Sequence, residues 1–183
     1  NLNGELIKFG NAFYYPRQDV LGTELHKKEL NASSTTGPSV PTSPTHVVDL
    51  NSSVNLEMIW VEPGTFTMGS PTTESGRGTN EAEHNVTLTK GFYLGKYELT
   101  QAQYEAVMTG NSNSLSVTPS NWSGPNRPVE NVSWDDIQIF LTRLNSNEQA
   151  AGRLPTGWSY ILPAESHWEY ACRAGTTSDY YFG

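Results

Sequence analysis

A segment rich in Ser, Thr and Pro divides this chain and limits what can fold on either side of it. Twelve of the fifteen residues from Asn31 to Thr45 are Ser, Thr, Gly or Pro, so the segment has almost nothing to bury. Prolines at every third position, from Pro38 to Pro44, favour an extended, polyproline-like course. We therefore predict a linker over residues 31–55, which separates a short piece from one larger unit.

The short piece, residues 1–30, contains brief apolar runs between glycines, which predict short strands. A piece of this size is too small to bury a core of its own. We therefore expect a β-like appendage, which either packs on the larger unit or is the remnant of a neighbouring domain or repeat.

Charge and cysteine content exclude several classes of protein. The 183 residues include 19 acidic and 11 basic side chains, and the net charge of -8 argues against nucleic acid as a partner. No stretch approaches the roughly 18 apolar residues of a membrane span. The single cysteine, Cys172, cannot form an internal disulfide, and no Cys/His set has zinc spacing, so an apolar core must support the fold.

Short strands and helices are expected to alternate in the larger unit. Residues 57–61 and 65–69 flank Pro63-Gly64, which predicts a hairpin. Residues 84–88 and 92–99 also have the pattern of strands. Mixed α+β structure is therefore predicted.

Two helices are marked by capping boxes. Thr100 is followed three residues later by Gln103, and Ser133 is followed in the same way by Asp136. An apolar stripe after Ser133 predicts a helix that Gly152 stops. The stripe consists of Trp134, Ile137, Leu141 and Leu144.

Large aromatic side chains are expected to fill the interior. We predict that Trp134 and Trp168 lie in the core beneath helices, and that the loop over residues 110–132 is ordered if Trp122 is buried. A strand at 160–162 precedes the last helix, which carries Trp168. The apolar residues 180–182 end where a partner strand would follow, so we expect a domain truncated at its C-terminus.

Four sequence blocks in a fixed order resemble the formylglycine-generating enzyme family, whose domain is also called the sulfatase-modifying factor domain. The blocks are MIWVEPGTFTMGS at 58–70, EAEHNVTLTKGFYLGKYELTQAQYEAVM at 81–108, RPVENVSWDDIQIFLTRLN at 127–145 and LPAESHWEYACRAGT at 162–176. The resemblance covers residues 56–183, as the N-terminal half of the family domain. It implies a C-type-lectin-like fold of short strands, flanking helices and much irregular structure.

The resemblance also implies an activity. Enzymatic members of the family use a pair of cysteines, reported as a copper site, to oxidise a substrate cysteine within Cys-x-Pro-x-Arg to formylglycine with molecular oxygen. Those cysteines, and most calcium ligands of the family, lie in the C-terminal half. Copper and calcium are therefore expected only where that half matches, and we predict no catalytic, cofactor-binding or metal-binding residue in this chain. Cys172 falls in another block, where we expect a small buried hydrophobe.

Several polar groups have the spacing of a possible site, but a structural role explains each of them more simply. Glu165 and Glu169, four residues apart on the last helix, are either paired carboxylates or a solvated face with one buried hydrogen bond. His167 lies between them, but neighbours at i and i+2 point apart on a helix, which argues against a metal. Asp135 and Asp136 suit a first helical turn, where the helix dipole favours negative charge.

The polar loop before residue 84 carries two further candidate patterns. His84 with Glu81 and Glu83 forms an alternating set that is more simply explained as rim charges. The Gly76-x-Gly78 loop lacks the Lys-Ser/Thr of a phosphate cradle and precedes no helix, so it does not indicate nucleotide binding.

Two functions follow as hypotheses. The first is a formylglycine-generating domain with a protein or peptide substrate, in which this chain supplies the scaffold. The second is a non-catalytic binding module whose Asn-rich loop, Ser112 to Trp122, contacts sugars or peptides. Non-haem iron relatives are a third option, although their His-x-x-x-His-x-Glu motif is absent. The Ser/Thr/Pro linker and low Lys/Arg content suggest an exported or cell-envelope bacterial protein.

Overall fold

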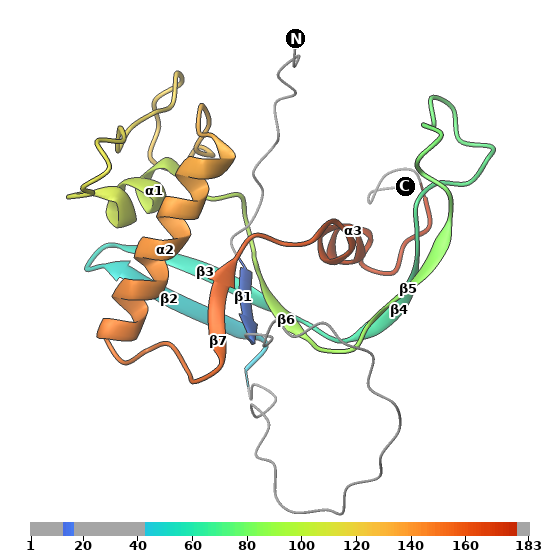
Figure 1. Cartoon of the computed structure of the whole chain (residues 1–183), viewed down its shortest axis with the longest axis horizontal. Coiled ribbons are helices and arrows are strands. Elements are labelled where there is room, and N and C mark those ends of the chain that lie inside the picture. Colours follow the sequence, from blue (N-terminus) through green and yellow to red (C-terminus); the bar gives the residue numbers. More distant parts are fainter. Residues whose placement is uncertain (1–12, 17–42, 179–183) are drawn as a thin grey trace, which may run out of the picture.

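The computed structural model describes residues 13–16, as backbone, and residues 43–178. This part of the chain is a mixed α+β structure with short antiparallel strands and three helices (Figure 1). The elements are β1 (Phe13–Pro16), β2 (Thr45–Asn51), β3 (Val54–Val61), β4 (Gly64–Met68), β5 (His84–Leu88), β6 (Phe92–Gly95), α1 (Gln101–Met108), α2 (Trp134–Ala150), β7 (Trp158–Ile161) and α3 (Glu165–Arg173). The predictions for residues 1–12, 17–42 and 180–182 lie outside the described residues.

Five strands form the main sheet, in the order β2-β3-β6-β1-β7. β1 lies between β6 and β7, and its residue Phe13 pairs with Leu94 on one side and Ile161 on the other. Part of the predicted appendage is thus a strand of this sheet. β2 begins at Thr45, inside the range predicted as linker, and pairs along β3.

The hairpin predicted around Pro63-Gly64 is wrong, because β3 and β4 do not pair with each other. β3 pairs with β2 and β6, whereas β4 pairs with β5 in a separate two-stranded sheet. The last β3–β6 pair is Val61 with Phe92, and the first β4–β5 pair is Gly64 with Leu88. The segment β3–β4 and the segment β5–β6 therefore run side by side as one long antiparallel ribbon. The ribbon bends at Pro63, whose nitrogen has no hydrogen to donate to a strand pair.

Two helices pack against the main sheet and enclose its core. Both predicted capping boxes are confirmed, at Thr100 for α1 and at Ser133 for α2. α2 ends at Ala150, two residues before the predicted stop at Gly152, whose φ of 67° is favoured in glycine. Tyr104 of α1 and Phe140 of α2 stack with ring centroids 5.7 Å apart. The buried cluster contains Val48, Leu56, Met58, Tyr93, Leu99, Tyr104, Val107, Met108, Val129, Ile137, Phe140, Leu141, Leu144, Trp158 and Tyr160.

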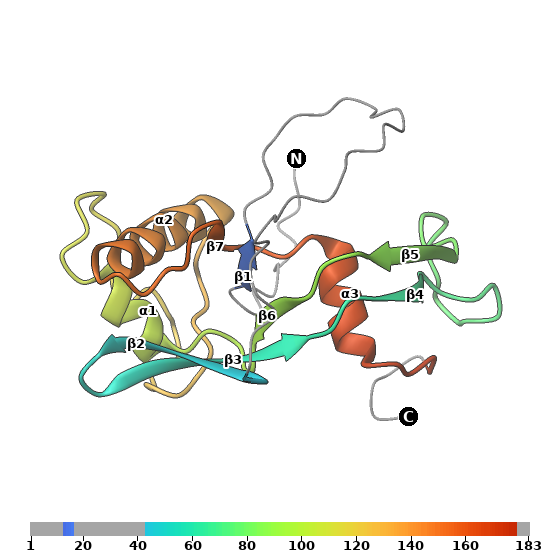
Figure 2. The same cartoon turned by 90° about the horizontal axis from the view of Figure 1, so that it is seen from below.

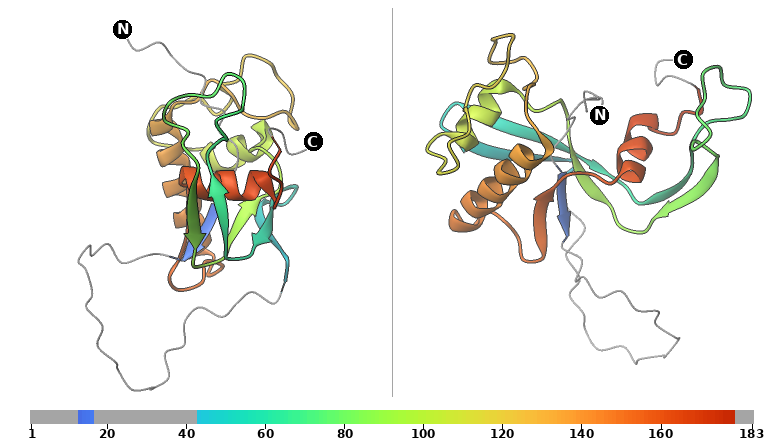
Figure 3. Two further views of the ribbon diagram at one scale, coloured as in Figure 1. Left: turned by 90° about the vertical axis from the view of Figure 1, so that its right-hand side faces the viewer. Right: turned by 45° about the horizontal axis from the view of Figure 1, so that its top comes forward.

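The third helix belongs to a smaller lobe formed by β4, β5 and α3. Figures 1 and 3 show α3 lying on the concave side of the bent ribbon, away from α1 and α2. Leu88 and Phe92 are the buried residues of this lobe's apolar cluster, and Tyr170 and Ala171 of α3 pack against them. No residue of α3 itself is buried. Among the residues that the structure describes, every helix is too short or too polar to span a membrane.

The prediction that Trp134 and Trp168 fill the core is wrong. Their side chains are 56% and 47% exposed. Trp134 is the first residue of α2, and the buried stripe of that helix begins one turn later, at Ile137. On α3 the residues that pack against the apolar cluster of the ribbon are Tyr170 and Ala171, whereas Trp168 lines a hollow with Cys172.

Two related predictions are also corrected. Cys172 is exposed rather than buried, because it follows Trp168 by one turn of α3. Trp122 is 72% exposed, so its burial cannot be what orders the loop over residues 110–132. Leu115 and Val117 of that loop pack against the main core instead.

Candidate functional site

A groove of about 710 Å³ lies between β4 and the C-terminal half of α3. Its aromatic lining residues are Trp60, Phe66 and Tyr170, and its acidic ones are Glu62 and Glu83. Arg173, the last residue of α3, and residues 174–177 after it also line the groove. The groove therefore combines aromatic surface with polar groups, as ligand sites commonly do.

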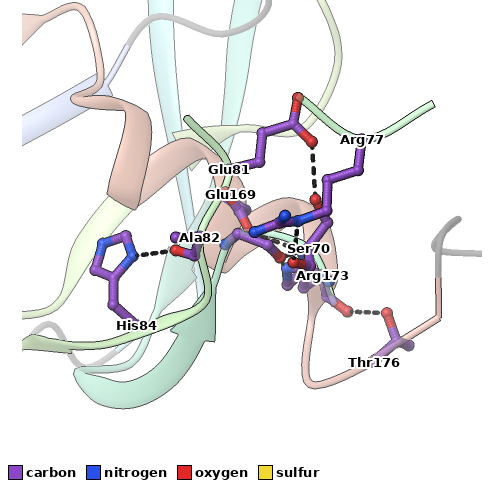
Figure 4. Close-up of polar contacts among 9 residues, drawn as sticks. Ser70, Arg77, Glu81, Ala82, His84, Glu169, Arg173 and Thr176 are labelled. Atoms are coloured by element: carbon purple, nitrogen blue, oxygen red, sulfur yellow. Dashed lines mark hydrogen bonds and ion pairs between the residues drawn. The ribbon is translucent and has the colours of Figure 1, made fainter. Parts of the chain in front are cut away.

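A charged clamp fastens α3 to the end of β4 (Figure 4). The Glu169 carboxylate accepts hydrogen bonds from the backbone nitrogen of Gly69 at 2.9 Å and from Arg173 Nε at 2.8 Å. Arg173 Nη2 donates to the carbonyl oxygen of Gly69 at 2.7 Å. Both backbone groups of Gly69 are thus held by one ion pair, whose side chains are 19% and 24% exposed. Partial burial makes this pair stronger than a pair in open water.

The loop after β4 is tied to the same point. Ser70 is buried, and its hydroxyl donates to Glu81 at 2.8 Å while its carbonyl oxygen accepts from Arg77 Nε at 2.8 Å. Figure 4 shows these contacts beside the clamp, on the opposite side from His84, whose Nδ1 lies 2.9 Å from the carbonyl oxygen of Ala82. The network fixes one end of the groove.

Aromatic packing fixes the other wall. The rings of Phe66 on β4 and Tyr170 on α3 lie 5.2 Å apart. A Cβ atom at Gly64 would collide with the Tyr170 hydroxyl, so only glycine lets the helix approach the strand this closely. The pair leaves an apolar surface at the groove that a bound side chain can contact.

His167 packs against the ribbon next to this groove. Its ring lies 5.1 Å from the ring of Phe92 in an edge-to-face arrangement. Burial lowers the pKa of His167 below its usual value of 6.5, because the charged imidazolium is poorly solvated there. His167 is thus placed as a neutral packing residue of α3.

The other residues that the sequence suggested as candidate sites lie in different places in the structure. Glu169 belongs to the clamp, whereas Glu165 is exposed at the first turn of α3, so the two do not act as a carboxylate pair. Cys172 lines a second hollow of about 270 Å³ with Trp168 and Arg173. Asp135 and Asp136 lie in the first turn of α2, as predicted.

The metal-ligating side chains of this chain do not fit the copper and calcium that the family resemblance implies. Copper in the enzymes of that family needs two cysteines, and this chain has one. Within residues 43–178, no three His, Cys, Asp or Glu side chains come together as a metal site.

Sequence reasoning did not find the groove. Its walls come from the β3–β4 region and from α3, which lie far apart in the chain. Gly69 and Arg173, which meet at one end of the groove, are more than 100 residues apart. A signal in the sequence that points toward it is the Glu169–Arg173 pair at helical spacing.

Comparisons with known proteins point to one family. The chain matches the model for the sulfatase-modifying factor enzyme 1-like domain over residues 45–183. It is 31% identical over 153 residues to a protein named chaperone protein LppX from Paenibacillus barcinonensis, across 70% of this chain and 49% of that protein. It is 25% identical over 164 residues to the formylglycine-generating enzyme of Mus musculus, across 65% of this chain and 40% of the enzyme. The chain therefore spans less than half the length of these two relatives.

Two solved structures share the fold. PvdO from Pseudomonas aeruginosa superposes with a TM-score of 0.62 at 24% identity, over 76% of this chain and 55% of that one. Treponema denticola variable protein 1 gives a TM-score of 0.56 at 22% identity, over 76% of this chain and 60% of that one. At these identities the likeness concerns the fold alone.

Proposed function

Because the chain belongs to the sulfatase-modifying factor enzyme 1-like domain family, we propose that it is a polypeptide-binding part of such a domain, which holds an extended segment of a protein partner in the groove between β4 and α3. The family predicted from the four sequence blocks is confirmed, and the match begins at residue 45 rather than 56. A C-type-lectin-like architecture is part of this proposal.

The observation that carries the proposal is an open strand edge beside the groove. Among the described strands, β4 pairs with β5 alone, so each strand of this small sheet has one unpaired edge. An extended polypeptide can add to such an edge through main-chain hydrogen bonds, while pockets accept its alternate side chains. Thr65, Phe66 and Thr67 of β4 all line the groove, which places the strand along its length.

The charges of the groove favour a segment that contains Lys or Arg. The ion pairs of the described residues use Glu57, Glu148 and Glu169, so neither Glu62 nor Glu83 is neutralised by a salt bridge. Arg173, the basic lining residue, is already paired with Glu169. A cationic side chain of the partner would offset the two acidic residues, and the net charge of -8 would attract it from a distance.

Oxidation of a cysteine in the bound polypeptide is a second candidate function, and fewer observations support it. A formylglycine-generating enzyme is among the relatives. The single Cys172 cannot supply the cysteine pair that the resemblance calls for, so we assign this chain binding without oxidation. The relative named as a chaperone also fits polypeptide binding. Bacterial relatives further support an exported protein as the setting.

Peptide binding by fluorescence anisotropy tests the proposal. The probes are unstructured labelled peptides with alternating Val and Lys, and matched peptides in which Glu replaces Lys. We expect the Lys peptides to bind at least tenfold more tightly, and Phe66→Ala and Glu62→Gln each to weaken them. Tyr97→Ala, at a side chain 65% exposed and outside the groove, is the control. Equal binding of both peptides, or of wild type and Phe66→Ala, contradicts the proposal.

The oxidation question has its own assay. A Cys-x-Pro-x-Arg peptide is incubated with the chain, copper and air, and its thiol is followed by mass spectrometry. We expect no loss of thiol beyond that in a sample without protein. Oxidation above that control would restore the enzymatic hypothesis.

A further inference from the structure

Trp122 is exposed in an unusual way, because its backbone is fixed while its ring is open. The side chain is 72% exposed, more than that of any other large hydrophobic residue in the described part of the chain. Its backbone nitrogen donates to the Glu130 carboxylate at 3.1 Å, and its carbonyl oxygen accepts from Gln101 Nε2 at 2.9 Å. An indole presented on a fixed backbone loses little conformational entropy when it binds a ligand.

The surrounding loop is anchored on both sides of Trp122. Gln101, the first residue of α1, also accepts from the backbone nitrogen of Gly124 at 3.0 Å. The Ser120 hydroxyl accepts from the backbone nitrogen of Glu130 at 3.1 Å. Upstream, Leu115 packs against the main core. The exposed ring therefore belongs to a preformed surface rather than to a loose loop.

The loop around Trp122 is itself polar and uncharged, and the charged groups beside it are Arg127, whose side chain lies near Gly124, and Glu130. None of the residues from Gly110 to Asn126 is acidic or basic, and Asn and Ser are frequent among them. Asn121, Ser123 and Asn126 are exposed close to Trp122 in the chain. The nearby Glu130 carboxylate already accepts from the Trp122 backbone. Amides and hydroxyls without charge are suited to a neutral ligand rich in hydroxyl groups.

We propose that the loop around Trp122 is a binding site for neutral carbohydrate. The indole ring would stack on the C–H face of a sugar ring, and the exposed amides and hydroxyls would hydrogen-bond to its hydroxyl groups. A ligand with strong charge would find no countercharge between Gly110 and Asn126. Arg127, near Gly124, is one cation, whereas an anionic membrane surface attracts clusters of basic residues, so such a surface is disfavoured.

The site is independent of the groove proposed for polypeptides. Figure 2 places the yellow loops between α1 and α2 at the far end of the molecule from β4, β5 and α3. Either proposal can therefore fail without the other.

Retention on insoluble neutral polysaccharides tests the proposal. The probes are cellulose, chitin, curdlan and raw starch, and the bound fraction is measured at several protein concentrations. We expect retention on at least one polysaccharide, reduced at least tenfold by Trp122→Ala. Trp168→Ala, which removes an exposed tryptophan of the other lobe, should stay within twofold of wild type. The melting temperature of Trp122→Ala should be unchanged, since the lost side chain is exposed.

Two variants of Glu130 separate positioning from ligand contact. Glu130→Gln keeps an oxygen that can accept from the Trp122 backbone, and we expect it to bind like wild type. Glu130→Ala removes that oxygen, and retention should fall three- to tenfold. Retention on none of the four polysaccharides, equal retention of Trp122→Ala, or complete loss with Glu130→Gln would each overturn the assignment.

Discussion

The lobe of the main sheet buries fifteen apolar or aromatic side chains in one cluster, whereas the apolar cluster of the α3 lobe includes two buried residues. The two helices of the first lobe begin with capping boxes, and α3 begins at Ala164 with no side-chain cap. The first lobe is thus stabilised mainly by apolar burial. The second depends on a few aromatic contacts and on the Glu169–Arg173 clamp at Gly69.

This difference connects stability with function. Regions with few buried apolar contacts open more easily than the rest of a fold, and binding sites are often found in them. The groove proposed for polypeptides lies in the weaker lobe, and its walls are held together by the Phe66–Tyr170 contact and by the clamp at Gly69. The Trp122 surface shows the opposite arrangement, because its loop is fixed to the stable lobe through Gln101.

The largest expected effect comes from the core of the main lobe. Phe140→Ala removes a fully buried ring that stacks on Tyr104, and it should cost about 3–5 kcal/mol. Trp134→Ala on the same helix is the matched control, and it should cost about 1 kcal/mol or less, since that ring is 56% exposed. Urea unfolding measures both values. Equal costs would mean that Trp134 is buried in solution and would break the comparison.

A smaller effect is expected where α3 meets β4. Gly64→Ala places a methyl group against the Tyr170 hydroxyl, and forcing the two apart should cost about 1–3 kcal/mol. Tyr170→Phe removes that hydroxyl, so the double variant should recover much of the loss. A double-mutant cycle by thermal unfolding measures the coupling. Additive costs would show that α3 does not contact β4 in this way.

The third prediction uses the missing cap. Ala164→Ser gives α3 a hydroxyl that can accept from its first turn, and it should stabilise the helix by about 0.5–1 kcal/mol. Thr100→Ala removes the cap of α1 and should cost a similar amount. Hydrogen exchange of the α3 amides should slow with Ala164→Ser while exchange in α1 stays unchanged. A uniform change in both helices would mean that the two lobes open together.

Local signals in the sequence predicted local structure well. The capping boxes at Thr100 and Ser133 and the stop at Gly152 depend on residues a few positions apart, so they can be recognised without the fold. The family was also within reach, because its blocks are contiguous. Such local signals predict the positions of α1 and α2 without any knowledge of tertiary contacts.

Features set by tertiary pairing could not be predicted in this way. The Pro63-Gly64 turn has the local pattern of a hairpin, yet β4 finds its partner in β5. Apolar size alone suggested that Trp168 is buried, although α3 turns Tyr170 toward the ribbon instead. The groove depends on the pairing of β4 with β5 and on Tyr170 facing the ribbon. Because neither was predicted from the sequence, the groove was not predicted either.

The smallest effect is a pH dependence to which each lobe contributes one histidine. Burial lowers the pKa of His46 in β2 and of His167 in α3 below the usual 6.5, although Glu148 partly opposes the shift of His46. The unfolded chain therefore binds more protons than the folded one as the pH falls below about 6.5. Stability from these groups is present above that pH and decreases on acidification.

Variants distinguish the two histidines. Thermal unfolding between pH 7.5 and 5 should show a slope that His46→Gln and His167→Gln each reduce, and that the double variant reduces further. If the α3 lobe opens by itself, hydrogen exchange of α3 should lose its pH dependence with His167→Gln and keep it with His46→Gln. Identical behaviour of the two variants would instead indicate a single cooperative unit, since a proton bound in either lobe would then act on the same transition.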